Sequence, residues 1–157
     1  KIMPRWAVFL IVILIIVDQV TKRVMLALVF DPPRTIEVTG FFNLVPVWNS
    51  GVSFGLLGNS ETSRWILVGL ALGITGFLLV WLVRAGTGVV VFALTLVVAG
   101  ALSNVIDRVL YGAVVDFVDV HGFGLHWPAF NVADVVIVVG TALLLYDGLF
   151  GSPRALK

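Results

Sequence analysis

Long uncharged stretches dominate the pattern of hydrophobic and polar positions along the chain. Residues 65–83 and 85–106 contain no charged side chain, and Arg84 alone separates them. A helix needs about 20 mostly apolar residues to cross the hydrocarbon core of a membrane. The two stretches therefore predict an antiparallel pair of membrane-spanning helices joined by a short turn.

Charged residues interrupt two further apolar runs. Residues 6–17 and 135–146 would each form a helix of about 18 Å, too short for a hydrocarbon core of about 30 Å. We therefore expect the first helix to continue through Asp18 and Lys22, and the last to begin near Asn131. The predicted spans within a single domain, 1–157, are 6–29, 65–83, 85–106 and 131–150.

Four spans place both chain ends on one side of the membrane and segments 30–64 and 107–130 on the other. Partial alternation of apolar and polar residues, with Gly and Pro between the runs, predicts short strands in these two segments. The expected fold class is an α-helical membrane protein, with four transmembrane helices and a small extracytoplasmic β platform. Lys and Arg divide evenly between the two sides, so charge counting does not fix the orientation. We expect cytoplasmic termini.

Composition narrows the possible functions. The chain is 60% hydrophobic and only 12% charged, which excludes a water-soluble globule. It has no cysteine, so disulfides, thiolate metal sites and cysteine nucleophiles are excluded. The net charge of +1 is too small to indicate a nucleic-acid partner. We therefore expect membrane lipid to surround the chain and to be its main partner.

Several ionisable residues within or beside the spans need a partner or a role, because isolated charges in lipid are costly. Asp18 and Lys22 are four residues apart on one helix face and are expected to pair. Asp107 and Arg108 cannot face each other on one helix, so we expect them to connect neighbouring segments.

Asp116, Asp119 and Asp134 have no cation three or four residues away. Unpaired acids beside a membrane are consistent either with solvated loop residues or with a carboxylate pair that shares one proton. Such a pair hydrolyses peptides: one carboxylate deprotonates water while the protonated partner polarises the carbonyl. Spacing alone does not choose between Asp116 and Asp119.

Two other patterns are weaker. Residues 51–55, Gly-Val-Ser-Phe-Gly, match the spacing of a serine nucleophile elbow but lack a convincing strand–turn–helix context. His121 and His126 are five residues apart in a Gly-rich segment with no third ligand at a suitable spacing, so we expect surface histidines and no metal.

As a set, the polar motifs resemble those of the lipoprotein signal peptidases (signal peptidase II), which are membrane aspartyl proteases of bacteria. The resemblance covers essentially the full chain. The matching blocks are DQVTK at 18–22, NSGVSF at 49–54, GALSNVIDR at 100–108, VVDF at 114–117 and FNVAD at 130–134.

The resemblance implies that Asp116 and Asp134 are the catalytic pair and that Asp119 is a bystander. Ser103 stands where the family usually has glycine. The supporting polar residues implied by the resemblance are Asp18, Lys22, Asn49, Gly51, Asn104, Asp107, Arg108 and Asn131.

The resemblance also implies a substrate and a location. The substrate would be a prolipoprotein whose cysteine carries diacylglycerol, cut just before that cysteine at the outer face of the bacterial cytoplasmic membrane. No cofactor is implied. The competing hypotheses are a small transporter or channel subunit, in which the acids line an ion path, and a purely structural membrane module.

Overall fold

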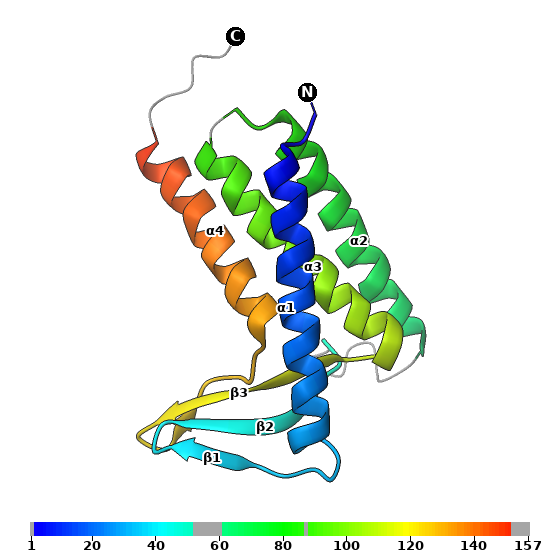
Figure 1. The fold of residues 1–157 in the computed structure, drawn as a ribbon, viewed down its shortest axis with the longest axis vertical. Helices are drawn as coiled ribbons and strands as arrows, with labels where there is room; N and C mark the ends of the chain where they lie inside the picture. Colours follow the sequence, from blue (N-terminus) through cyan, green and yellow to red (C-terminus); the bar gives the residue numbers. More distant parts are fainter. Residues whose placement is uncertain (1, 52–60, 87, 152–157) are drawn as a thin grey trace.

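The computed structural model describes residues 2–51, 61–86 and 88–151, which form four α-helices and a four-stranded sheet (Figure 1). The helices lie side by side, with the chain ends at one end of the bundle and the sheet at the other. The elements in chain order are α1 (Arg5–Val29), β1 (Ile36–Thr39), β2 (Phe42–Asn49), α2 (Glu61–Arg84), α3 (Gly88–Tyr111), β3 (Val114–Gly122), β4 (Leu125–His126) and α4 (Val132–Phe150).

Three of the described helices, α2, α3 and α4, are long and apolar enough to cross a membrane. The predominantly helical fold and the small antiparallel sheet confirm this part of the predicted fold class. α1 has 25 residues but carries Asp18, Lys22 and Arg23 in its second half. Arg23 is exposed, but most of the other exposed side chains of α1 are apolar; they include Phe9, Val12, Ile16, Val20 and Val24.

α3 lies farther along the chain than the predicted 85–106 span. It begins at Gly88, because residues 85 and 86 form a connection and do not continue the helix. It runs on to Tyr111, so Asp107 and Arg108 belong to the helix, with Arg108 in its last turn. An uncharged stretch underestimates the length of a helix when the charged residues that bound the stretch find partners inside the protein.

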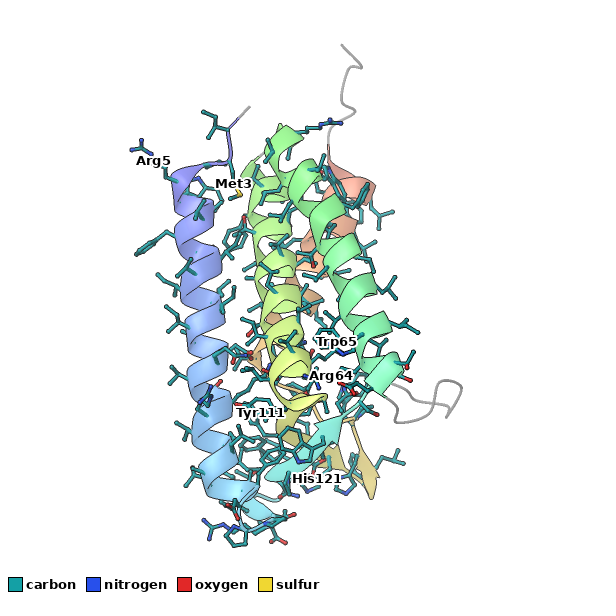
Figure 2. All side chains as sticks on the ribbon, turned by 90° about the vertical axis from the view of Figure 1, so that its right-hand side faces the viewer. Met3, Arg5, Arg64, Trp65, Tyr111 and His121 are labelled. Atoms are coloured by element: carbon teal, nitrogen blue, oxygen red, sulfur yellow. The ribbon has the colours of Figure 1, made fainter. Side chains whose placement is uncertain are left out.

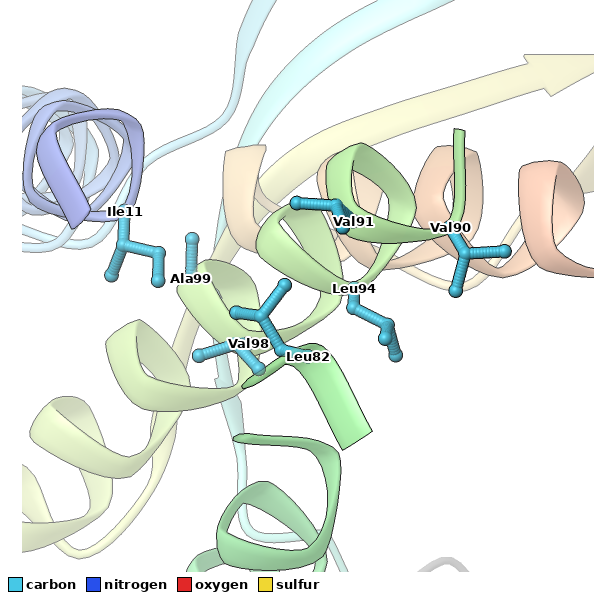
Figure 3. Close-up of a cluster of buried hydrophobic side chains, with 7 residues drawn as sticks. All are labelled: Ile11, Leu82, Val90, Val91, Leu94, Val98 and Ala99. Atoms are coloured by element: carbon cyan, nitrogen blue, oxygen red, sulfur yellow. The ribbon is translucent and has the colours of Figure 1, made fainter. Parts of the chain in front are cut away.

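The helical core is centred on α3, where the apolar side chains of three helices meet. Ile11 from α1 and Leu82 from α2 pack against Leu94, Val98 and neighbouring α3 residues (Figure 3). On the other side of α3, Gly100 of α3 and Gly140 of α4 allow these two helices to approach each other closely. A Cβ on Gly100 would lie 2.5 Å from the Ala133 carbonyl oxygen. Small residues at such contacts are typical of helix packing in membranes.

The sheet has the strand order β1-β2-β3-β4, and every neighbouring pair is antiparallel. Val115 and Phe117 point to one face of β3 and pack with Val29 and Phe30 at the end of α1. Because side chains alternate along a strand, Asp116 points to the opposite face. Aromatic contacts from Trp48 to Phe30 and Tyr111 also attach the sheet to the helices, and Figure 2 shows Tyr111 at this junction.

Candidate active site

Asn131 connects the two acids that the resemblance singles out. Its side-chain amide donates to Asp116 Oδ1 at 2.7 Å, and its backbone N–H donates to Asp134 Oδ2 at 3.1 Å. Its side-chain oxygen accepts from the Asp134 backbone N–H, which completes a capping box at the start of α4. The same residue therefore starts the helix and fixes the positions of both carboxylates.

Asp116 lies on β3 and is 1% exposed. Its second oxygen accepts a hydrogen bond from Asn49 Nδ2 at 2.8 Å, at the end of the neighbouring strand β2. Burial raises the pKa of Asp116 to about 6, and the negative charge of Asp134 contributes in the same direction. The hydrogen bonds from Asn49 and Asn131 and the charge of Lys22 oppose that rise. Asp116 therefore keeps its proton to a higher pH than an ordinary aspartate.

Asp134 is half-buried in the first turn of α4. Its Oδ1 accepts a hydrogen bond from Asn104 Nδ2 on α3 at 2.9 Å. The Asn104 amide is itself oriented by Lys22, whose ammonium group donates to Asn104 Oδ1 at 2.9 Å. Hydrogen bonds therefore connect Lys22 on α1, Asn104 on α3 and Asp134 on α4, and they hold the Asp134 carboxylate in place.

Lys22 is the centre of a buried charge cluster. Its ammonium group lies 2.7 Å from Asp18 Oδ2 and 2.8 Å from Asp107 Oδ2, and it also donates to Asn104. These contacts use its three N–H donors, so this charge is fully compensated although the residue is only 1% exposed.

The two acids of this cluster also connect separate segments of the chain. Asp18 Oδ1 accepts from the Ala133 backbone N–H at 2.7 Å, an otherwise free donor at the start of α4. Asp107 accepts from the Val115 backbone N–H at 3.1 Å, next to Asp116 on β3. The cluster therefore holds α1, α3, α4 and the sheet in register around the carboxylate pair.

Gly51 and Arg108 lie at the side of the site nearest the end of β2. The Gly51 backbone N–H donates to Asn49 Oδ1 at 2.9 Å, and its φ of +75° favours glycine. A Cβ at Gly51 would lie 3.3 Å from the Arg108 guanidinium. Arg108 Nε is buried without a hydrogen-bond partner among the described residues.

Each aspartate lines a different cavity. Asp116 lies in a groove of about 310 Å³ over the sheet, whose walls include Trp48, Gly51 and Pro128. Asp134 lies at the edge of an apolar cavity of about 300 Å³ along the outer face of α4. The other residues lining this second cavity are Trp127, Phe130, Val135, Val138 and Val139.

The structure brings all the predicted site residues together. Side-chain and backbone contacts connect them into one network, although they come from five elements and the adjoining loops. The members are Asp18, Lys22, Asn49, Gly51, Asn104, Asp107, Arg108, Asp116, Asn131 and Asp134. Ser53 of the serine pattern lies outside the described residues.

Three further residues make contacts in this network, and the sequence alone predicted no role for them. The Ser103 hydroxyl donates to Asp18 Oδ2 at 2.6 Å, and Gln19 donates to Asp107 Oδ1 at 2.7 Å. Arg64 donates to the Arg108 and Val109 carbonyls, near the end of α3. Gln19 lies inside the matching block at 18–22, which is the signal that could have identified it. Ser103 stands where the family usually has glycine and Arg64 lies outside the blocks, so neither carries such a signal.

Spacing along the sequence offered no third ligand for the two histidines, but the fold brings Asp119 beside them. Asp119, His121 and His126 each offer a ligand atom within 4.8 Å of the others, which makes them a possible metal-ion site. The hydrogen bond with His126 lowers the pKa of Asp119. Asp119 therefore interacts with the histidines and Asn43 in the described structure, and no hydrogen bond joins it to the carboxylate pair.

Comparisons with known proteins agree with this architecture. The profile of the family described as signal peptidase (SPase) II matches residues 10–150. A lipoprotein signal peptidase of Methylobacterium sp. (strain 4-46) is 44% identical over 142 residues, covering 89% of this chain and 86% of that protein. One from Ralstonia nicotianae is 46% identical over 141 residues, covering 88% and 80%.

A solved structure described as a bacterial membrane enzyme, determined by the in meso method at 1.9 Å resolution, superposes with a TM-score of 0.81. Its sequence is 30% identical, and the match covers 93% of this chain and 94% of that one. A second bacterial membrane enzyme, at 2.3 Å resolution, gives a TM-score of 0.75 at 30% identity, covering 96% and 94%. This chain is therefore a multi-pass membrane protein and belongs to the signal peptidase II family.

Proposed function

We propose that this chain is an aspartyl endopeptidase that removes the signal peptide from diacylglyceryl-modified prolipoproteins, cutting just before the lipidated cysteine. The observation that carries the proposal is the placement of Asn131, which hydrogen-bonds Asp116 and Asp134 at once. Two carboxylates fixed by one residue beside two cavities form a site for acid–base hydrolysis of a peptide. Family membership and the names of the relatives supply the substrate class.

In this mechanism Asp116 holds the shared proton, since burial raises its pKa to about 6. Protonated Asp116 donates a hydrogen bond to the carbonyl oxygen of the scissile peptide. Ionised Asp134 takes a proton from a water molecule, which attacks the carbonyl carbon. Collapse of the tetrahedral intermediate breaks the C–N bond, and the leaving nitrogen takes a proton from the pair.

The two cavities fit the two parts of the substrate. The groove beside Asp116 has the exposed end of β2 along one wall, so an extended peptide can lie along the sheet. The apolar cavity beside Asp134 is lined by aromatic and valine side chains and suits hydrocarbon. A peptide that passes from one cavity to the other places its scissile bond between the two carboxylates.

We further propose that α1 is a fourth span. Its 25 residues give a length of about 37 Å, which exceeds a hydrocarbon core of about 30 Å. Asp18 and Lys22 are buried against α3 and α4, while apolar side chains face outward. Four spans would place both ends of the chain on one side of the membrane and the sheet on the other; we propose that the ends are cytoplasmic and that the sheet with the active site is extracytoplasmic.

The test is cleavage of a synthetic diacylglyceryl-modified lipobox peptide by the purified chain in detergent, with the products located by mass spectrometry. The unlipidated peptide of the same sequence is the matched control. We expect one cut, before the cysteine, and far slower cleavage of the control. Cleavage elsewhere, or equal cleavage of both peptides, would contradict the proposal. Ion flux in liposomes without proteolysis would support the transporter alternative.

A further inference from the structure

A second cluster of chemically active side chains lies at the far end of the sheet. The tip of the β3–β4 hairpin turns at Phe123 and Gly124, which both have positive φ, at 52° and 77°. Such a two-residue turn pairs His121 directly with His126 across the two strands. Asp119 precedes His121 by two residues and therefore points to the same face of β3. The topology thus collects two imidazoles and one carboxylate on one face.

The ring nitrogens that face the carboxylate are the Nδ1 atoms. His126 Nδ1 lies 2.8 Å from Asp119 Oδ1, and His121 Nδ1 lies 3.4 Å from Asp119 Oδ2. His121 Nδ1 is buried and has no hydrogen-bond partner among the described residues. The imidazole rings stack with their centroids 4.7 Å apart. One buried nitrogen of the pair is therefore unsatisfied and faces Asp119.

Asn43, on the neighbouring strand β2, fixes the orientation of the carboxylate. Its side-chain amide donates to Asp119 Oδ2 at 3.1 Å, and it is 9% exposed. Hydrogen bonds of this kind hold the ligands of metal sites in position. The His126 side chain is 59% exposed, which leaves one side of the cluster open to solvent.

We propose that Asp119, His121 and His126 form a binding site for Zn²⁺, with water as the fourth ligand. Two histidines and a carboxylate are a common donor set for zinc, and its ligand atoms lie about 3.3 Å apart in a tetrahedral site. The observed nitrogen–oxygen separations of 2.8 and 3.4 Å are close to that value, and binding requires the stacked imidazole rings to turn so that both Nδ1 atoms point at one ion. The ion bonds to His121 Nδ1 and so satisfies a nitrogen that otherwise lacks a partner.

The ion would hold β4 against β3 and thereby affect the segment that follows. Trp127 and Phe130 line the apolar cavity, while Pro128 and Ala129 line the groove over the sheet. Zinc thus stabilises a wall shared by both cavities. It takes no part in peptide hydrolysis, so the site stands independently of the proposed function.

The sequence makes a direct test possible, because the chain has only two histidines and no cysteine. Isothermal titration of ZnCl₂ into the untagged protein in detergent should give one site per chain. Co²⁺ should give the visible absorption of a tetrahedral complex at the same stoichiometry. H121Q, H126Q and D119N should each weaken Zn²⁺ binding by at least about tenfold, since each removes one of three ligands.

Two control variants locate the site. E37Q removes an exposed acid from the same sheet, and D116N removes a carboxylate of the active site. Both should bind Zn²⁺ like the wild type. The proposal is overturned if the wild type binds no Zn²⁺, or if H121Q and H126Q bind it as the wild type does. Loss of binding in D116N alone would also overturn it by placing the ion at the active site.

Hydrogen exchange supplies a second readout. Zn²⁺ should slow amide exchange in residues 118–130 of the wild type and have no effect there in H126Q. His126 is exposed, so this variant should fold, and an unchanged thermal midpoint without metal would show that it does. Binding without any change of exchange in this segment would refute the stabilising role.

Discussion

Replacing Gly100 with alanine should separate α3 from α4 beside the active site. The added Cβ would lie 2.5 Å from the Ala133 carbonyl oxygen and 2.6 Å from Ile137 Cγ1. Ordinary contact begins at 3.4 Å, so the helices must move apart by about 0.9 Å because a backbone oxygen cannot rotate away. Ala133 directly precedes Asp134, and this displacement therefore moves a proposed catalytic carboxylate.

The expected effects are large enough to measure. Overpacking of this kind costs about 1–3 kcal/mol of stability. A misplacement of about 1 Å at a reacting group costs about 100-fold in rate. We therefore expect Gly100→Ala to lower the thermal midpoint in detergent and to reduce kcat for the lipidated lipobox peptide by about 100-fold.

Two matched variants separate the causes. A Cβ on Gly73 of α2 meets nothing within 4 Å, so Gly73→Ala should keep full activity and wild-type or higher stability. A Cβ on Gly140 would lie 2.6 Å from the Ala93 carbonyl oxygen, but Gly140 lies farther along α4, so Gly140→Ala should lose stability with a smaller loss of rate. Wild-type turnover and stability in Gly100→Ala would refute the reasoning.

The charge cluster and the raised pKa give two further predictions. Lys22→Met leaves Asp18 and Asp107 buried without their cation, which should cost about 3–5 kcal/mol and appear as a large fall of the thermal midpoint or as loss of folded protein. A thermal midpoint equal to that of the wild type would contradict the described network. Because the pKa of Asp116 is about 6, loss of the shared proton should lower kcat/KM as the pH rises through that value. A kcat/KM that increases steadily over about pH 4.5 to 8 would count against Asp116 as the proton holder.

Local patterns were sufficient to predict much of the fold. The uncharged window at 65–83 lies inside α2, and the polar residues around Asn131 mark the start of α4. Asp18 and Lys22 pair as their spacing predicts, because helix geometry alone brings them together.

Contacts between distant parts of the chain could not be predicted in this way. The hydrogen bond of Asn104 to Asp134 and the ion pair of Lys22 with Asp107 depend on how three helices pack. Spacing also left Asp116 and Asp119 as alternatives. They are three residues apart on one strand and so point to opposite faces, but tertiary packing decides which face meets α4.

The histidine cluster was missed for a different reason. Spacing along the Gly-rich segment offered no third ligand for the two histidines, whereas a two-residue turn at Phe123 and Gly124 sets the strand register there. Only that register makes His121 and His126 cross-strand partners and adds Asp119 as a third ligand. Turn geometry, and not ligand spacing along the sequence, creates the site.

The central claim is that Asp116 and Asp134 act together as the catalytic pair. The most direct test is cleavage of the diacylglyceryl-modified lipobox peptide, with a chelator present, by the wild type, Asp116→Asn, Asp134→Asn and Asp119→Asn. Asp119 is the matched control, because it lies on the same strand as Asp116 but contacts Asn43 and the histidines. We predict cleavage before the cysteine by the wild type and Asp119→Asn, and none by the other two variants in their folded form. Substantial turnover by folded Asp116→Asn or Asp134→Asn, or loss of activity in Asp119→Asn alone, would contradict the account.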